Sequence, residues 1–135
     1  MKMPRPKAIV FDMDGTLVDV SSVRHHVLGK KRNFDAFHLG AVNCPPIPHI
    51  VESARMAARD GFRVLQVTAR SERYRSSTSW WIAENQVPSD ALFMRADGDY
   101  RPAYEVKRDI LDQLLKSYDI VKAFDDNPNI VRLWG

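Results

Sequence analysis

The sequence predicts an α/β fold, a Rossmann-like doubly wound parallel sheet with helices on both faces. Short apolar runs of strand length alternate with stretches of helical periodicity, and this order is typical of parallel sheets joined by right-handed crossovers. Polar and acidic side chains follow the predicted strands. A chain of 135 residues, 44% of them hydrophobic, suffices for one compact core. We therefore expect one domain over residues 1–135.

Four apolar runs have the length and composition of strands, and the first of them is expected to be buried. They cover residues 7–12, 62–67, 91–94 and 120–124. The first contains Ala-Ile-Val-Phe, and the turn residues Gly15 and Thr16 come shortly after it. We expect these four segments to pair in one sheet.

Helical patterns occupy the intervals between the predicted strands. They cover residues 48–60, a stretch from Ser71 and Glu72 through Ile82, and residues 104–116. Gly61 stands where a helix C-terminal cap is expected, and Ser71 can cap the second helix. Another helix begins near the end, where a doubly wound sheet often adds a strand. C-terminal truncation is therefore compatible with this sequence.

The interval from Val18 to Pro48 has no clean period and predicts a long loop. It contains His25 and His26, which no matching His or Cys set accompanies, so we do not expect them to bind a metal. Cys44 lies there beside two prolines and is expected to be structural.

Composition excludes several classes of protein. With 20 Lys and Arg against 17 Asp and Glu, the formal charge of +3 permits an anionic partner without requiring one. The apolar run of residues 8–11 is too short for a signal peptide or membrane span, so a soluble, cytoplasmic protein is expected. A single cysteine rules out an intrachain disulfide. No Walker A sequence is present.

The residues able to carry chemistry stand at the predicted strand ends. They are Asp12 and Asp14 after the first strand, Thr68 after the second, Asp125 and Asp126 after the fourth, and Lys107 near the start of a helix. They should converge, because ligands of such sheets bind at the carboxyl ends of the strands. Carboxylates gathered there repel each other unless a cation is present, and all-oxygen ligands suit Mg²⁺.

Each of these residues also has a structural interpretation. Acidic residues at strand ends can cap helices, Thr68 can serve a turn, and Lys107 can be a solvated charge. For Thr68 or Lys107 alone the structural interpretation is favoured. The full set in this order favours a functional site, because buried carboxylates at a strand end are costly without a cation.

The segment Asp12-Met-Asp-Gly-Thr-Leu17 resembles the first motif of the haloacid dehalogenase (HAD) superfamily of phosphatases. Thr68, Lys107 and the pair Asp125-Asp126 match the other three motifs in order. Thirty residues between Leu17 and Pro48, and 38 between Thr68 and Lys107, leave no room for a large cap domain. The resemblance therefore implies the HAD core with an open site.

The resemblance also implies roles for these residues. Asp12 would attack phosphorus and form an aspartyl-phosphate, while Asp14 would pass protons and offer its backbone carbonyl to the metal. Gly15 and Thr16 would form the turn and hold the phosphate near both carboxyls. Thr68 and Lys107 would hold the transferring oxygens. The magnesium ligands would be Asp12, Asp14, Asp125 and Asp126.

Three segments resemble the phosphatase domain of polynucleotide kinase-phosphatases. They are Pro6–Asp12, Thr68–Glu72 and Ala123–Asp126. In that family one arginine after the second motif and one after the first contact the phosphate, and Arg70 and Arg24 stand at or near those places. The resemblance implies removal of a terminal 3′ phosphate from DNA or RNA. It is also compatible with a kinase as a partner protein or as a further domain.

Two other functions remain open from the sequence. One is a phosphatase of nucleotides or other small metabolites, which would need the 18–48 segment or a partner as a lid. The other is an inactive nucleic-acid-binding module. The basic run 24–32 and Arg70, Arg73 and Arg75 could follow a phosphate backbone or be solvated charges. Trp80 and Trp81 are expected in the core rather than stacked on bases.

Overall fold

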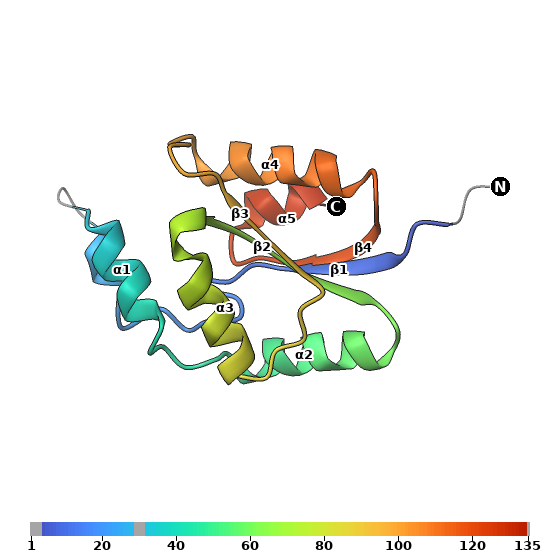
Figure 1. The fold of residues 1–135 in the computed structure, drawn as a ribbon, viewed down its shortest axis with the longest axis horizontal. Coiled ribbons are helices and arrows are strands. Elements are labelled where there is room, and N and C mark those ends of the chain that lie inside the picture. Colours follow the sequence, from blue (N-terminus) through green and yellow to red (C-terminus); the bar gives the residue numbers. More distant parts are fainter. Residues whose placement is uncertain (1–3, 29–31, 135) are drawn as a thin grey trace.

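A four-stranded parallel sheet lies between two layers of helices in the computed structural model, which describes residues 4–28 and 32–134 (Figure 1). The strands are β1 (Lys7–Phe11), β2 (Arg63–Ser71), β3 (Ala91–Arg95) and β4 (Asp119–Phe124). Their order is β3-β2-β1-β4, and every neighbouring pair is parallel. The predicted fold class is confirmed, and all four strands lie where the apolar runs indicated.

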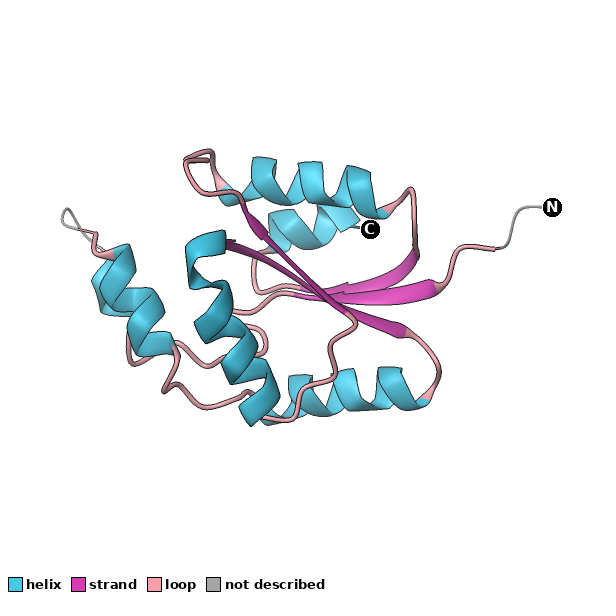
Figure 2. Cartoon of the chain, viewed as in Figure 1, coloured by secondary structure: helices cyan, strands magenta, loops and turns pink. Residues whose placement is uncertain are grey.

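Helices cover both faces of the sheet, α2 and α3 on one and α4 and α5 on the other (Figure 2). The α-helices are α1 (Phe34–Ala41), α2 (Pro48–Arg59), α3 (Arg75–Glu84), α4 (Ala103–Leu114) and α5 (Pro128–Trp134). Two 3₁₀ turns are η1 (Arg24–Val27) and η2 (Glu72–Tyr74). None of the helices in the described part of the chain is long and apolar enough to cross a membrane.

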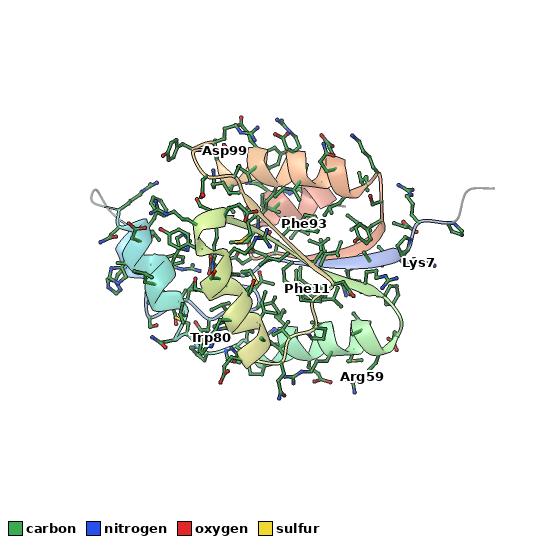
Figure 3. All side chains as sticks on the ribbon, viewed as in Figure 1. Lys7, Phe11, Arg59, Trp80, Phe93 and Asp99 are labelled. Carbon is green, nitrogen blue, oxygen red and sulfur yellow. The ribbon has the colours of Figure 1, made fainter. Side chains whose placement is uncertain are left out.

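Alternate residues of β1 build the two halves of the core. Ile9 and Phe11 pack into the cluster that contains the buried faces of α2 and α3, and Ala8 and Val10 pack with Leu114 of α4 on the other side. Phe11, labelled in Figure 3, also stacks on Phe124 of β4 with ring centroids 4.7 Å apart. Successive side chains of a strand point to opposite faces, and both sets are buried in β1. This burial holds the strand in one orientation and so fixes the direction in which the chain leaves it.

Helix α2 ends at the predicted glycine cap. Gly61 has φ +87°, and its N–H donates to the carbonyl of Ala58 at 3.1 Å. The N–H of Phe62 donates to the carbonyl of Ala57 at 3.0 Å. These two bonds form a Schellman motif, which lets the chain turn directly into β2.

The prediction of a long loop from Val18 to Pro48 is wrong, because this segment contains η1 and α1. The Asn33 side chain caps α1 by accepting the N–H of Ala36 at 3.0 Å. Phe37 and Ala41, four residues apart, form its buried stripe. Exposed Leu39 between them obscured the helical period. Lys30 and Lys31 lie outside the described residues.

The two ends of this segment lie against each other. Val18 forms an antiparallel bridge with Pro46, the Asp19 N–H donates to the Pro45 carbonyl at 2.9 Å, and Ile47 N–H donates to the Leu17 carbonyl at 2.8 Å. Between these ends, α1 lies beyond the carboxyl ends of the strands (Figure 1). Residues 19–45 thus make a small appendage, and no cap domain occurs in residues 4–28 or 32–134.

Helix α3 starts later than the sequence predicted. Ser71 is the last residue of β2, its side chain caps neither η2 nor α3, and the helix begins at Arg75. Strand β2 runs longer than predicted because it continues past Thr68 with an irregular register against β3. The prediction that Ser71 caps this helix is therefore wrong, although the helix itself exists.

The two neighbouring tryptophans of α3 have different environments. Trp81 is 1% exposed, as predicted, and its Nε1–H donates to the carbonyl of Cys44 at 2.9 Å. Trp80 is 50% exposed and points away from the core (Figure 3), so its assignment to the core is wrong. Adjacent helical residues differ by about 100° around the axis, so both cannot face one core.

We expect Trp81→Ala to lower the free energy of unfolding by about 3–5 kcal/mol, because it leaves a cavity and an unpaired carbonyl. Trp80→Ala is the matched control and should change it by about 0.5 kcal/mol or less. Chemical denaturation of both variants measures the difference. Equal losses would contradict the described orientation of α3.

Candidate active site

Side chains from four elements meet at the carboxyl ends of the strands, as the sequence predicted. Asp12 and Asp14 follow β1, Thr68 and Arg70 lie near the end of β2, Lys107 is on α4, and Asp125 and Asp126 follow β4. All seven line one cavity of about 1100 Å³. Their convergence follows from the parallel sheet, because every strand ends at the same edge.

A tight turn after β1 orients the side chains of Asp12 and Asp14. The N–H of Asp12 donates to the Phe124 carbonyl at 2.9 Å, and Leu17 and Val18 N–H groups both donate to the Met13 carbonyl. Gly15 sits in the turn with φ +81°, and a Cβ built there would lie 2.2 Å from Asp126 Oδ2. Only glycine fits this turn without displacing Asp126.

Thr16 is buried in the same turn, with its Oγ1 3.5 Å from Asp12 Oδ2. It faces a smaller cavity beside Asp125 and Asp126, and it is not among the described residues that line the large one. The contact places Thr16 where it can orient the Asp12 carboxylate. Its predicted contact with phosphate remains a prediction.

Three carboxylates form a group able to hold a cation. One oxygen each from Asp12, Asp125 and Asp126 lies within 4.8 Å of the others. These hard oxygen donors fit Mg²⁺, which binds through carboxylates and keeps several waters. The carboxylate of Asp14 points instead to Arg70, and the predicted contribution of its backbone carbonyl remains a prediction.

Lys107 bridges two of these carboxylates. Its Nζ lies 3.1 Å from Asp12 Oδ1 and 2.5 Å from Asp125 Oδ2, and the side chain is 5% exposed. Burial lowers the pKa of Lys107, but attraction to Asp12 and Asp125 outweighs burial and leaves that pKa above its ordinary value. Lys107 is therefore a fixed positive charge beside Asp12.

Burial raises the pKa of Asp12 to about 8, with Lys107 opposing the rise and Asp125 and Asp14 adding to it. Burial and the neighbouring Asp125 also raise the pKa of Asp126. With a pKa of about 8, the Asp12 carboxyl holds a proton at neutral pH until a cation replaces it. Without a cation, the Asp12 shift makes the folded chain less stable as the pH rises from about 4 to 8, because the unfolded carboxyl is already ionised.

We expect Mg²⁺ binding to expel about one proton from Asp12, so that affinity rises by up to about tenfold per pH unit below pH 8. Calorimetric titration in two buffers with different ionisation enthalpies measures this proton directly. Above pH 9 the proton release should fall towards zero. Affinity that does not change between pH 6 and 8 would contradict a protonated Asp12.

Asp14 is held by a buried arginine. Arg70 is 3% exposed, its Nε donates to Asp14 Oδ2 at 2.9 Å, and its Nη2 donates to Asp14 Oδ1. Its Nη1 donates to Thr78 Oγ1 at 2.9 Å, and Thr78 is completely buried on α3. Sequence reasoning missed Thr78, although it shares a helical face with Trp81 and Ile82. Thr78 orients Arg70, and Arg70 orients Asp14.

Thr68 anchors the irregular end of β2. Its Oγ1 accepts the N–H of Arg70 at 3.2 Å, where the register between β2 and β3 shifts. This bulge turns Arg70 towards Asp14. The turn interpretation of Thr68 is therefore confirmed. Its hydroxyl still has a proton to donate, and its contact with the transferring oxygens remains a prediction.

The other arginines occupy different places. Arg24 lies 3.8 Å from Asp126 Oδ2, half exposed, and is not among the described residues lining the large cavity. Arg73 lines that cavity, whereas Arg75 pairs with Glu72 and the Leu92 carbonyl. The phosphate contacts predicted for Arg24 and Arg70 remain predictions.

The outer part of the cavity was not predicted. It is lined by Phe34 and His38 of α1, Tyr74 of η2 and the loop 97–101. Burial lowers the pKa of His38 to about 4, so its imidazole is neutral at neutral pH. The residues Asp97, Gly98 and Asp99 mark a polar loop in the sequence. A long loop predicted for the 18–48 segment gives no reason to place Phe34 or His38 in a cavity wall.

Comparison with known proteins identifies a matching family. The family described as the polynucleotide kinase PNKP phosphatase domain matches residues 6–135. A protein of Autographa californica nuclear polyhedrosis virus, described as "Putative bifunctional polynucleotide kinase/RNA ligase", is 24% identical over 131 residues. The match covers 96% of this chain and 18% of the viral protein.

Solved structures agree with this match. A chain of the Pnkp1/Rnl/Hen1 complex superposes with a TM-score of 0.82 and 25% identity, covering 98% of this chain and 43% of that one. A second structure, of the Pnkp1/Rnl/Hen1 RNA repair complex, gives 0.79 and 26%, with 96% and 39% covered. A class C acid phosphatase from Bacillus anthracis with tungstate bound shares the fold, with a TM-score of 0.72, 18% identity, and 95% and 54% covered. The chain thus spans less than half the length of the relatives related to polynucleotide repair.

Proposed function

Since the chain belongs to the family of PNKP phosphatase domains in the HAD superfamily, we propose that it is a magnesium-dependent polynucleotide 3′-phosphatase acting in nucleic-acid end repair. The observation that carries the proposal is Asp12. This buried carboxylate lies beside the fixed charge of Lys107 and within one cation-sized group with Asp125 and Asp126. Such an arrangement suits a nucleophile whose charge is needed only when cation and phosphate are bound.

The proposed reaction has two displacements. An oxygen of the ionised Asp12 carboxylate forms a bond to phosphorus while the bond from phosphorus to the substrate 3′ oxygen breaks, and Asp14 gives that oxygen a proton. Water then attacks the aspartyl-phosphate, Asp14 takes the water proton, and the Asp12–phosphorus bond breaks. Phosphate leaves and both carboxyl groups return to their starting states.

The surrounding residues serve these two aspartates. Arg70, braced by Thr78, holds Asp14 in one orientation, while the Thr68 hydroxyl and Lys107 ammonium can donate to phosphoryl oxygens. Magnesium held by Asp12, Asp125 and Asp126 would supply positive charge that offsets repulsion between the nucleophile and the phosphate. The site thus has a donor or a charge for each developing negative oxygen.

Substrate size supports a polynucleotide end. A cavity of about 1100 Å³ is slightly larger than the usual small-molecule site, which measures roughly 300–1,000 Å³. The small appendage of residues 19–45 forms one wall of this cavity through Phe34 and His38. The relatives are named as kinase, ligase or RNA repair proteins, and we propose that this chain also works beside a kinase.

The experiment compares Mg²⁺-dependent phosphate release from a 3′-phosphorylated oligonucleotide and from the matching 3′-mononucleotide. We expect kcat/KM to be at least about tenfold higher for the oligonucleotide, since contacts beyond the terminal nucleotide add binding energy. DNA and RNA versions of the same sequence show which is preferred. Equal or reversed preference would replace this proposal by a metabolite phosphatase, and no turnover of either would favour a binding module.

A further inference from the structure

We propose that the outer cavity contains a nucleobase-stacking subsite formed by the rings of Phe34 and Tyr100. The inference rests on the proposed function and deepens it, because it identifies what holds the strand whose terminal phosphate reaches Asp12. The ligand is an unpaired nucleobase near the 3′ end. Both rings line the same cavity as Asp12, yet they come from different elements, α1 and the loop between β3 and α4.

Both aromatic side chains are open to solvent. Tyr100 is 94% exposed and Phe34 is 53% exposed, whereas Phe37, one turn along α1 from Phe34, is buried. A single exposed aromatic residue is ordinary on a protein surface. Phe34 and Tyr100, however, both line the cavity that contains Asp12. Their exposed faces lie where a substrate strand would lie, and aromatic faces stack on bases of any sequence.

The backbone around Tyr100 is fixed on both sides of the residue. Arg95 Nη1 donates to the carbonyls of Asp99 and Arg101, at 2.9 and 2.5 Å, and its Nε donates to the Ala69 carbonyl at 2.7 Å. Arg101 is tied in turn to Asp99 and to Asp109 of α4. Figure 3 labels Asp99 at the tip of this loop. A ring on an anchored loop loses little entropy when a base stacks on it.

The wall that carries Phe34 is tied to the same place. Asp35, the next residue of α1, accepts hydrogen bonds from Arg73 and from the Tyr74 hydroxyl of η2. The backbone N–H of Arg73 donates to Asp97 Oδ1 at 3.1 Å, which links η2 to the loop of Tyr100. The 3₁₀ turn η2 is therefore bonded to both walls of the subsite.

The exposed ring faces indicate bases as the ligand of this subsite. Arg32, two residues before Phe34, also lines the cavity and makes no ion pair among the described residues, so it is available to a backbone phosphate. Arg73 is engaged with Asp35, and Arg101 with Asp99 and Asp109. Tyr74 is likewise covered, by His38 with ring centroids 4.4 Å apart and by Arg73. Phe34 and Tyr100 are left as faces open to a ligand, so stacking is the interaction they offer.

The test uses Phe34→Ala and Tyr100→Ala with single-stranded 3′-phosphorylated oligonucleotides, either intact or with abasic sugars in the last two positions. Each variant should raise KM for the intact strand by about tenfold without changing kcat, and leave KM for the abasic strand unchanged. Tyr100→Trp, which keeps an aromatic ring at this position, should have the wild-type KM. Tyr104→Ala is the matched control, because Tyr104 is 42% exposed nearby but is not among the described cavity-lining residues.

A binding readout separates this inference from the proposed function. Strands carrying 2-aminopurine near the 3′ end should lose fluorescence on wild-type protein with Mg²⁺ and keep it on the Phe34→Ala, Tyr100→Ala double variant. Failure of the proposed function would appear as no phosphate release from any oligonucleotide, whatever the fluorescence does. Unchanged KM and unchanged quenching in the variants, or equal KM losses on abasic strands, would overturn the stacking subsite.

Discussion

Asp12→Asn should abolish phosphate release, with kcat lower by at least about 10⁴-fold, because an amide cannot form the aspartyl-phosphate. The change is nearly isosteric, and it removes a carboxyl whose charged form burial disfavours. The variant should therefore fold with undiminished thermal stability at pH 8 in the absence of a cation. Single-turnover phosphate release and a thermal melt of the same sample measure both results.

Asp19→Asn is the matched control for this prediction. Asp19 lies seven residues along the chain, and its Oδ1 accepts the N–H of Ser21 at 3.1 Å in an exposed turn. This variant should keep wild-type turnover, since its carboxylate belongs to neither the cavity nor the cation-binding group. Turnover by Asp12→Asn within tenfold of wild type would exclude Asp12 as the nucleophile.

Gly15→Ala should reduce turnover by at least about 100-fold, because a displacement of about 1 Å among catalytic groups costs this much. A Cβ at position 15 would lie 2.2 Å from Asp126 Oδ2, so the Asp126 carboxylate must move out of the cation-binding group. Mg²⁺ affinity should fall with it, measured by calorimetry. The positive φ of this residue adds about 1–3 kcal/mol of backbone strain.

Gly61→Ala separates the steric effect from the strain. Gly61 has a similar φ of +87°, but no atom lies within 4 Å of a Cβ built there. This variant should lose about 1 kcal/mol of stability and retain both Mg²⁺ affinity and turnover. If Gly15→Ala behaves in the same way, the close approach of Asp126 has no functional weight.

Strands and helices were predictable from the sequence where an apolar run or a regular apolar stripe marks their buried side chains. Each of the four strands contains a short, mostly apolar run, and α2 combines a regular stripe with a glycine cap. Helix α1 escaped detection because its buried stripe has only two members, Phe37 and Ala41, among exposed apolar neighbours. Trp80 and Trp81 are chemically identical, and only the rotation of α3 about its axis decides which is buried.

The composition of the candidate site was predictable for a similar reason. Parallel strands bring their carboxyl ends to one edge, so position along the chain was enough to gather Asp12, Thr68 and Asp125. The pairings within the site were not, because they depend on side-chain directions. The Asp14–Arg70–Thr78 chain requires the bulge after Thr68, and no spacing in the sequence encodes a bulge.

The joined ends of residues 19–45 make this appendage exchangeable. The segment leaves the core at Leu17 and Val18 and returns at Pro46 and Ile47, with hydrogen bonds across the junction. Closing a loop whose ends already meet adds little entropic cost as the loop lengthens. A transplanted segment with the apolar contacts of Val20, Val23 and Phe37 could therefore change one wall of the cavity while the turn carrying Asp12 and Asp14 remains intact. Evolution or an engineer can vary substrate choice there without rebuilding the catalytic centre.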